Sequence, residues 1–497
     1  MNGAKNWFLA IPFEIIDKIF VECLPTGFQP LHPQYAPLLL THVCSFWRTF
    51  ALNCPNLWKK FSLESSPIAE TSDNTAEGIF ARRQQKMLQQ IALWRSASKG
   101  PRLTVSLDLE HTVPLQSKEP VWHEHIQAVL VDHIESIHKL RLFISWANEA
   151  NPLLRLPGQR LCNLEYLHLY VWAYPPEPSL VEHLSVAPNL RRFQLAVRRG
   201  DVKSVLLHQQ LTHLYLLDYT IYYGSPKLHT ILQSFPALKS LSMFVCQVES
   251  KWNINDSTIV MHHLTDLSLT FEIRARPGPP FDVSVFNEKS FPVLNYLQLA
   301  CKTNHRYDNW SMLHHPDQAH FLSQLRLLRT LVLTNQIIPG DELLELLHST
   351  PLLVKLSVES DLQNYFSFFD GLTYHPFGAG LEQNRIPKLE EFAIYVDTAE
   401  SSTDDGFEVE LIWFKESMLL MIQSRCPSRH EVLSINDDRP ARLRKFLLCT
   451  DSGGLKILIP DGLDEINSLL TDGLDFESRE VAPGSADEWA VKELSFW

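Results

Sequence analysis

The stretch Leu294-Asn295-Tyr296-Leu297-Gln298-Leu299 is one copy of a pattern, apolar-x-x-apolar-x-apolar, that decides the fold of this chain. Its last two apolar residues alternate as in a short strand with one buried face, and the first would anchor the turn leading into that strand. Ten copies follow one another along the middle of the chain. They begin at Ile137, Leu164, Leu190, Leu211, Leu238, Leu264, Leu294, Leu328, Leu353 and Leu389.

Helices are expected between these strands. The clearest covers residues 341–348, an amphipathic segment with Asp341 and Glu342 in its first turn, and Thr350-Pro351 ends it. One strand and one helix per unit, stacked in parallel, predict an α/β fold of the β/α solenoid kind. An ordinary α/β domain with leucine-rich strands is the alternative. A proline stands two residues before several copies, at Pro188, Pro236, Pro292, Pro351 and Pro387.

The pattern resembles irregular leucine-rich repeats. The Asn or Cys that this family places after the strand is well positioned only as Cys246, whereas Arg198, Glu272 and Lys302 stand there in other copies. The asparagine ladder that joins neighbouring turns in the family is therefore mostly missing, and we expect short helices and loops to compensate. The resemblance implies a solenoid over residues 101–430, followed by an acidic C-terminal repeat or cap over residues 431–497.

A different pattern occupies residues 11–58. Pro12 suits the start of a helix, and Glu14 suits its first turn, where the helix dipole favours a negative charge. Pro37 can open a second helix, which Pro55 would end. Both helices carry apolar residues at helical spacing, and a short third apolar segment follows. These residues are Ile15, Ile16, Ile19, Phe20 and Cys23, then Leu39, Val43, Phe46, Trp47 and Phe50, then Leu57, Trp58 and Phe61.

Three short helices over about fifty residues cannot bury much surface alone, so a partner or a neighbouring domain must cover the rest. The order Ile11-Pro12-Phe13-Glu14, then Val43-Cys44-Ser45-Phe46-Trp47-Arg48, then Leu57-Trp58 resembles an F-box. The segment from Pro25 to Pro37 is longer than the usual link between the first two helices, a feature similar to F-box-like proteins of mushroom-forming fungi. The alternative is an unrelated helical domain with these residues in its core.

The F-box resemblance implies a domain over residues 1–61 that docks on the Skp-type adaptor of a cullin-based (SCF) ubiquitin ligase. The pattern does not separate residues of the adaptor contact from residues of the domain's own core. The residues expected at the contact are Ile11, Pro12, Ile15, Ile16, Ile19, Phe20, Leu39, Val43 and Trp47.

Residues 62–100 are expected to connect the two parts. Residues 62–78 are rich in Ser, Glu and Thr and indicate a linker, and residues 77–96 have the apolar spacing of a helix. The alternating stretch 103–109 then predicts a strand.

The composition of the chain limits the classes of function that it can have. The chain has 497 residues with a formal net charge of -13, which argues against a nucleic-acid partner. No uninterrupted apolar stretch is long enough to predict a membrane span. Eight cysteines without a Cys-x-x-Cys pair indicate free thiols in a reducing compartment, so we expect a cytoplasmic or nuclear protein.

Signatures of catalysis are missing from the sequence. It contains no His-Glu-x-x-His, no Gly-x-Ser-x-Gly and no glycine-rich phosphate loop. His123 and His125 stand close together, but no Cys or carboxylate set completes a metal site around them. We therefore expect no cofactor and no bound metal.

The sequence thus predicts a non-catalytic adaptor. The N-terminal domain would dock on the Skp-type adaptor and through it on a cullin, and the repeats would hold a substrate protein near the ubiquitin-charged enzyme. Loops that break the repeat period, including residues 303–320, are candidates for binding it. The alternatives are a non-ligase leucine-rich-repeat interaction scaffold and, behind it, an enzyme with an unrecognised site.

Overall fold

The computed structural model describes the chain in segments that form two compact units, residues 1–226 with 497 and residues 227–496. Each unit is an α/β structure built on parallel strands. The residues described are 11–25, 32–64, 76–98, 102–108, 133–144, 158–171, 187–197, 210–217, 232–246, 259–273, 289–303, 318–334, 338, 340–360, 366–374, 386–396, 407–426, 441–450 and 473–480.

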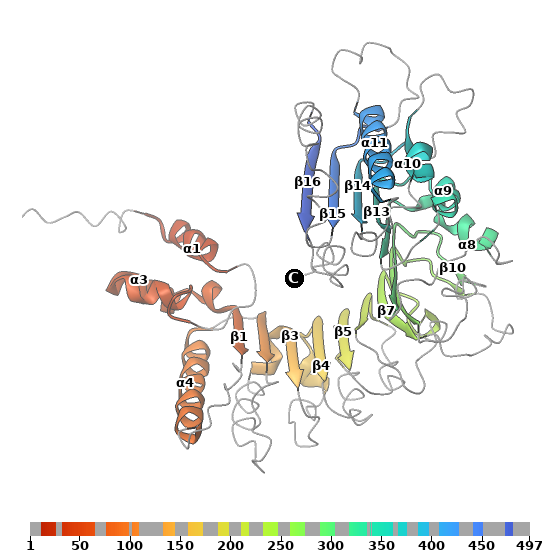
Figure 1. Ribbon diagram of the computed structural model, residues 1–497. Coiled ribbons are helices and arrows are strands. Elements are labelled where there is room, and N and C mark those ends of the chain that lie inside the picture. The colour runs from red at the N-terminus through yellow and green to blue at the C-terminus, as the bar shows by residue number, and fades with distance from the viewer. Residues whose placement is uncertain are drawn as a thin grey trace, which may run out of the picture. The chain divides into compact units, whose positions relative to one another are not determined.

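The first unit starts with helices and continues as a sheet (Figure 1). Its strands are hydrogen-bonded in chain order, from β1 to β6, and its strand pairs are parallel. The elements are α1 (Phe13–Glu22), α2 (Leu38–Val43), α3 (Ser45–Asn53), η2 (Pro55–Trp58), β1 (Lys60–Glu64), α4 (Ala76–Ala97), β2 (Leu103–Asp108), η3 (Ile134–Ser136), β3 (Ile137–Ile144), η4 (Gly158–Leu161), β4 (Tyr166–Val171), β5 (Arg192–Val197) and β6 (His213–Leu217).

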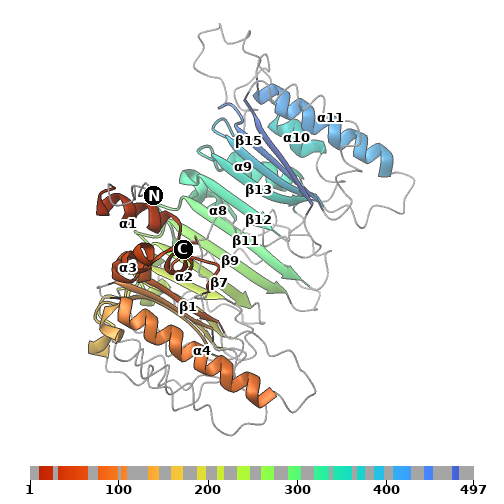
Figure 2. The same cartoon turned by 90° about the vertical axis from the view of Figure 1, so that its left-hand side faces the viewer.

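The second unit repeats the arrangement with helices between its later strands. Figure 2 shows its strands side by side, and their order is β7-β9-β11-β12-β13-β14-β15-β16, with β8 and β10 in a separate small parallel pair. The elements are β7 (Ser240–Cys246), β8 (Ile259–Val260), β9 (Asp266–Ile273), β10 (Lys289–Ser290), β11 (Tyr296–Thr303), α8 (Gln318–Gln324), η7 (Leu325–Leu327), β12 (Thr330–Thr334), α9 (Gly340–His348), β13 (Lys355–Ser360), α10 (Phe366–Leu372), β14 (Glu391–Val396), α11 (Phe407–Arg425), β15 (Lys445–Thr450) and β16 (Asp475–Glu480).

The repeat pattern sets the register of the strands. Leu297 of β11 pairs with Leu267 on one side and Leu331 on the other, and Leu299 pairs with Leu269 and Leu333. The alternating apolar residues therefore form continuous rows, and each of these six side chains is buried. Burial of about 25 cal/mol per Å² of apolar surface along such rows is the main force that stacks the repeats.

Helices cover the leucine rows of the second unit. Phe369 of α10 lies 6.3 Å from Phe392 of β14 and 5.3 Å from Phe414 of α11, measured between ring centroids. Helix α10 approaches α9 closely at Gly371, where a Cβ would lie 2.7 Å from the methyl groups of Leu344. The predicted helix at 341–348 is confirmed as α9.

Polar side chains at the turns replace the missing asparagine ladder. Asn189 Nδ2 donates to the Cys162 carbonyl at 2.6 Å, and Gln210 Nε2 donates to the Ala187 carbonyl at 2.6 Å. In the second unit the Thr265 hydroxyl has two acceptors within reach, the Asp266 carboxylate at 2.6 Å and the Lys239 carbonyl at 3.1 Å. The bonds to Cys162 and Ala187 join the turn before one strand to the preceding repeat, so loops and helices are not the only compensation.

The α/β class with many parallel strands is confirmed, and the sheet extends beyond the ten predicted copies. β15 is a further copy that the prediction missed, with Phe446 and Leu448 continuing the apolar rows. β1 begins at Lys60, so the first residues of the expected linker are a strand. The predicted helix at 77–96 is confirmed as α4.

Candidate interaction surfaces

Helix α1 divides its apolar residues between two faces. It begins at Phe13, directly after Pro12, and carries Glu14 in its first turn. Ile16 and Phe20 are buried, whereas Ile15 is 45% exposed and Ile19 is 48% exposed. Since Ile15 and Ile19 are one turn apart, they form an apolar stripe on the outside of the helix. We call them the α1 stripe.

The single second helix expected from Pro37 to Pro55 is wrong. Cys44 adopts an extended conformation (φ −160°, ψ 171°) and separates α2 from α3, and its Sγ accepts a hydrogen bond from the Trp47 N–H at 3.5 Å. The Arg48 Nε–H donates to the Thr41 carbonyl at 2.8 Å and holds the two helices across this break. Helix propensity alone does not show such a break, because the side-chain cap forms only once the chain turns.

The break leaves a second exposed stripe on α2. Leu39 is 45% exposed and Val43 is 54% exposed, again one turn apart. We call them the α2 stripe. Exposed apolar pairs of this kind on a small helical domain are typical of surfaces that another protein covers.

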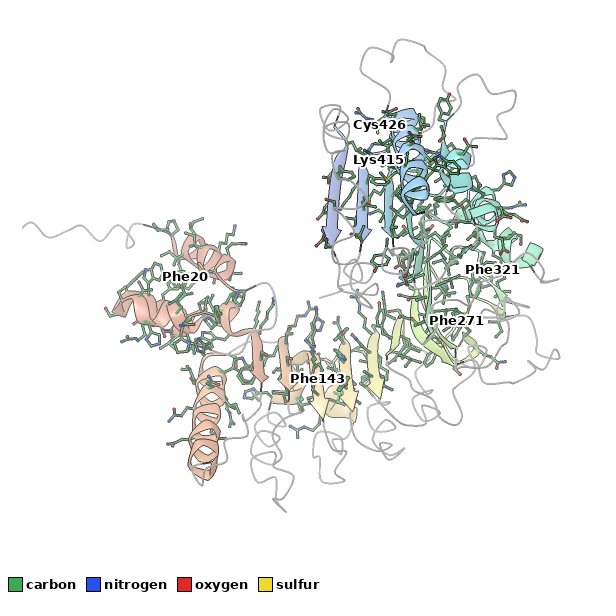
Figure 3. The ribbon with its side chains drawn as sticks, viewed as in Figure 1. Phe20, Phe143, Phe271, Phe321, Lys415 and Cys426 are labelled. Atoms are coloured by element: carbon green, nitrogen blue, oxygen red, sulfur yellow. The ribbon has the colours of Figure 1, made fainter. Side chains whose placement is uncertain are left out.

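Aromatic residues form the inside of the helical domain (Figure 3 labels Phe20). The ring of Phe20 lies 4.8 Å from that of Trp47 and 5.1 Å from that of Phe50, and Phe13 lies 4.5 Å from Phe50. These contacts pack α1 on α3. Trp47 is therefore half-buried against Phe20 and is part of the core as well as the surface.

A polar contact joins the start of the domain to its end. Asp17 of α1 accepts hydrogen bonds from the Cys54 thiol at 2.6 Å and from Asn56 Nδ2 at 2.9 Å. Burial, and then the hydrogen bond to Asp17, raise the pKa of the Cys54 thiol to about 11. The thiol thus stays protonated and keeps donating to the carboxylate near neutral pH.

A pair of buried tryptophans fixes the helical domain to the sheet. The Trp58 indole donates to the Ala51 carbonyl at 2.7 Å, and the Trp94 indole of α4 donates to the Trp58 carbonyl at 2.7 Å. The ring of Trp94 also stacks at 4.7 Å on Phe61 of β1. Because α3, η2, β1 and α4 meet here, the exposed stripes are held on a rigid support.

The structure sorts the residues expected at the adaptor contact. The α1 and α2 stripes and Pro12 are exposed, Ile11 and Trp47 are half-buried, and Ile16 and Phe20 belong to the core. Phe13, which the sequence did not single out, is exposed at 54% although its ring contacts Phe50. Five of the nine expected residues are therefore exposed and can contact a partner.

A second surface lies on the face of the first unit's sheet opposite the leucine rows. Here β3, β4, β5 and β6 are paired so that two rows cross the strands. We call these rows the basic-aromatic face, although it also holds Gln194. The first row is Lys139, Tyr166, Arg192 and His213, and the second is Arg141, His168, Gln194 and Tyr215.

Contacts within this face orient its side chains. The Arg141 guanidinium lies 4.5 Å from the centre of the Phe143 ring, and the Tyr166 hydroxyl donates to Gln194 Oε1 at 2.8 Å. Burial, and then the charge of Arg141, lower the pKa of His168 to about 3, so its imidazole is neutral near pH 7. Lys139, Arg141 and Arg192 carry the permanent positive charges of the face. The sequence could have indicated these residues, since they stand between the apolar positions of each copy.

Metal and membrane signatures are not found where the structure is described. No group of three or more His, Cys, Asp and Glu residues suited to a metal ion occurs among the described segments. Their helices are also too short or too polar to cross a bilayer. His123 and His125 lie outside the described residues, as does most of the candidate loop 303–320.

Comparison with protein-family models and with curated proteins finds no match for this chain.

Proposed function

We propose that this protein is a substrate-recognition adaptor of an SCF ubiquitin ligase. Its N-terminal helices would bind the Skp-type adaptor and through it the cullin, and its leucine-rich-repeat-like sheet would bind a substrate protein. The chain itself makes and breaks no covalent bond in this role. It raises the effective concentration of the substrate near a ubiquitin-charged enzyme of the complex.

The exposed apolar stripes carry the proposal. The α1 stripe lies in the isoleucine-rich helix that follows the opening motif of the F-box resemblance, and Val43 of the α2 stripe begins its Val-Cys-x-x-Trp-Arg segment. Four aliphatic side chains that are 45–54% exposed would lose water contact under a partner. Anchors of this type each contribute on the order of 2 kcal/mol to binding when fully buried.

The position of these stripes also favours an adaptor role. The tryptophan pair fixes the helices to the first strand of the sheet, so a partner on the stripes would be held in a defined orientation to the first strands of the repeats. A rigid connection suits a protein that must present a substrate to an enzyme on another subunit.

The test is retention of a purified Skp-type adaptor by the full-length chain, measured by biolayer interferometry. The variant Ile15→Asp/Ile19→Asp places two charges on the α1 stripe and should weaken binding at least about a hundredfold. The matched control is Ile412→Asp/Leu420→Asp on α11, where both residues are also exposed and apolar. It should bind as wild type does.

Two results would contradict the proposal. One is a wild-type chain that does not bind the Skp-type adaptor at micromolar concentrations. The other is an α1-stripe variant that binds as well as the α11 control. Either result would favour the non-ligase scaffold, in which the helical domain binds another partner.

A further inference from the structure

We propose that the basic-aromatic face of the first unit binds an acidic segment of a protein, rich in Asp and Glu or in phosphorylated residues. This inference rests on the proposed function, since it assigns a chemical class to the substrate. It also assigns the binding to one face of one unit.

The strands of this face have a charge opposite to that of the chain. β3, β4, β5 and β6 contain Lys139, Arg141 and Arg192 and no Asp or Glu, whereas the whole chain carries a net charge of -13. Glu135 and Glu165 stand beside these strands and lie 3.3 Å from Arg160 and 3.5 Å from His138, respectively. Asp108 of the neighbouring strand β2 pairs in register with Phe143 and marks the acidic edge of this face. The cationic face is thus a local feature within an acidic protein, which attracts an acidic ligand.

The spacing of the three cations fits an extended peptide. Lys139 and Arg192 are two strands apart in the same row, a separation of about 10 Å, and Arg141 is two residues from Lys139, about 7 Å. An extended chain advances about 3.4 Å per residue and its side chains alternate between two faces, so carboxylates two residues apart share a face and, at about 7 Å, match the spacing of Lys139 and Arg141. Arginine suits such ligands further because its guanidinium can bind a carboxylate or phosphate through two parallel hydrogen bonds.

Aromatic side chains supply the apolar part of the surface. Tyr166, Tyr170 and Tyr215 stand on the same side of the strands as Arg141; Tyr166 is buried, whereas Tyr170 and Tyr215 are half-buried and supply apolar surface. Figure 3 shows Phe143 among the side chains of this sheet. Arg141 is held over Phe143, so its side chain is already ordered before a ligand arrives. Tyr and Arg are the residue types that most often dominate protein–protein binding, and ordered side chains lose less entropy on binding.

In the described strands of the second unit, carboxylates stand beside the cations on this side of the sheet. On the same side of its strands, Lys355 of β13 pairs with Glu391 of β14 at 2.8 Å. Val332, Tyr395 and Cys449 form a buried apolar cluster on that side. Lys445 likewise stands in register between Glu391 and Asp475, so the described cations of the second unit are matched by carboxylates and would attract an acidic peptide less than those of the first unit.

The experiment measures binding of a fluorescein-labelled oligoglutamate of about ten residues to the full-length chain by fluorescence anisotropy. We expect binding that weakens as salt is raised from about 0.05 M to 0.5 M. The variant Arg141→Gln/Arg192→Gln should bind about tenfold more weakly. The charge-preserving variant Arg141→Lys/Arg192→Lys should lose less, and Lys355→Gln/Lys445→Gln on the second unit should bind as wild type does.

Two outcomes would overturn the inference. The first is equal binding of oligoglutamate by wild type and Arg141→Gln/Arg192→Gln while circular dichroism shows both folded. The second is an oligouridylate of equal charge that binds more tightly than oligoglutamate, which would make the face a nucleic-acid surface.

The outcomes are separable from the test of the adaptor proposal. Arg141→Gln/Arg192→Gln should retain the Skp-type adaptor fully, and Ile15→Asp/Ile19→Asp should bind oligoglutamate as wild type does. Loss of peptide binding with intact adaptor retention therefore concerns this face alone.

Discussion

The two units have the same buried rows and different open faces. On the buried side, Leu167 and Phe193 of the first unit occupy the positions that Leu267 and Leu297 occupy in the second. On the open side, the first unit shows cations with the half-buried Tyr170 and Tyr215, whereas the second pairs Lys355 with Glu391 and has a buried apolar cluster around Tyr395. The comparison teaches that the repeat determines stacking, and that the residues between its apolar positions determine what each stretch of sheet can bind.

The largest effect is expected when one unit is destabilised by a core substitution and hydrogen exchange is measured in both units. Trp94 is fully buried and donates to the Trp58 carbonyl, so Trp94→Ala should cost about 3–5 kcal/mol of stability in the first unit. Hydrogen exchange read by mass spectrometry should show faster exchange in β1–β4 and little change in β11–β14. Phe392→Ala is the reciprocal control for the second unit. Equal loss of protection in both units would show that they unfold as one.

Acid should weaken the first unit through His168. Burial holds the pKa of its imidazole near 3 in the folded chain, below the value of about 6.5 when unfolded. Below pH 6.5 the unfolded chain therefore binds a proton that the folded chain does not. Stability should fall by on the order of 1 kcal/mol per pH unit between about pH 6 and pH 4.

Urea unfolding across this pH range, followed by the protection of β4, measures the effect. His168→Gln should flatten the dependence, and His348→Gln, at the exposed end of α9, should leave it unchanged. A slope that persists in His168→Gln would assign the acid sensitivity to other groups.

Removing one side-chain hydrogen bond from each unit tests how strongly such bonds join neighbouring repeats. Asn189 donates to Cys162 at 2.6 Å in the first unit, whereas the Thr265 hydroxyl of the second lies 3.1 Å from the Lys239 carbonyl and 2.6 Å from the Asp266 carboxylate. Asn189→Ala should lower stability by about 1 kcal/mol because the carbonyl of the preceding repeat loses a donor. Thr265→Val should cost less, since the single hydroxyl proton has a closer acceptor in Asp266 than in the preceding repeat. Thermal unfolding of both variants tests this order, and the reverse order would refute it.

The smallest effect concerns single charges on the open faces. Lys355→Gln removes an ion pair that is about a third exposed, so it should destabilise by about 0.5 kcal/mol or less. Arg192→Gln removes one of three like charges and should be neutral or slightly stabilising. The difference in stability between the two variants should be smaller in high salt, which screens exposed charges. Denaturant unfolding of both variants at low and high salt measures these effects. A clear loss of stability in Arg192→Gln would contradict the prediction that this charge is not stabilising.

Much of the fold could be predicted because one local pattern is repeated. The apolar positions of the copies at Leu264, Leu294 and Leu328 lead directly into β9, β11 and β12. The copy in β15 was missed because the preceding segments vary in length, and β1 because it lies next to a helical motif. The break at Cys44 was missed for a different reason, since six residues of α2 and nine of α3 read as one continuous helical period.

The candidate sites were predictable only in part. The motif found the α1 and α2 stripes, but it could not exclude Ile16 and Phe20, because helical spacing alone does not show which face is covered. The basic-aromatic face was not predicted at all. Lys139, Arg141 and Arg192 are scattered over more than fifty residues of sequence, and only strand pairing brings them into two rows.

The sequence by itself determined the parallel stacking of strands, because every copy carries the same alternation of buried residues. It also determined the location of the motif that suggests a ligase adaptor. Tertiary structure alone decided which apolar residues of that motif stay in contact with water and which cations share a face. Both depend on contacts between residues far apart in the chain, which no local pattern contains.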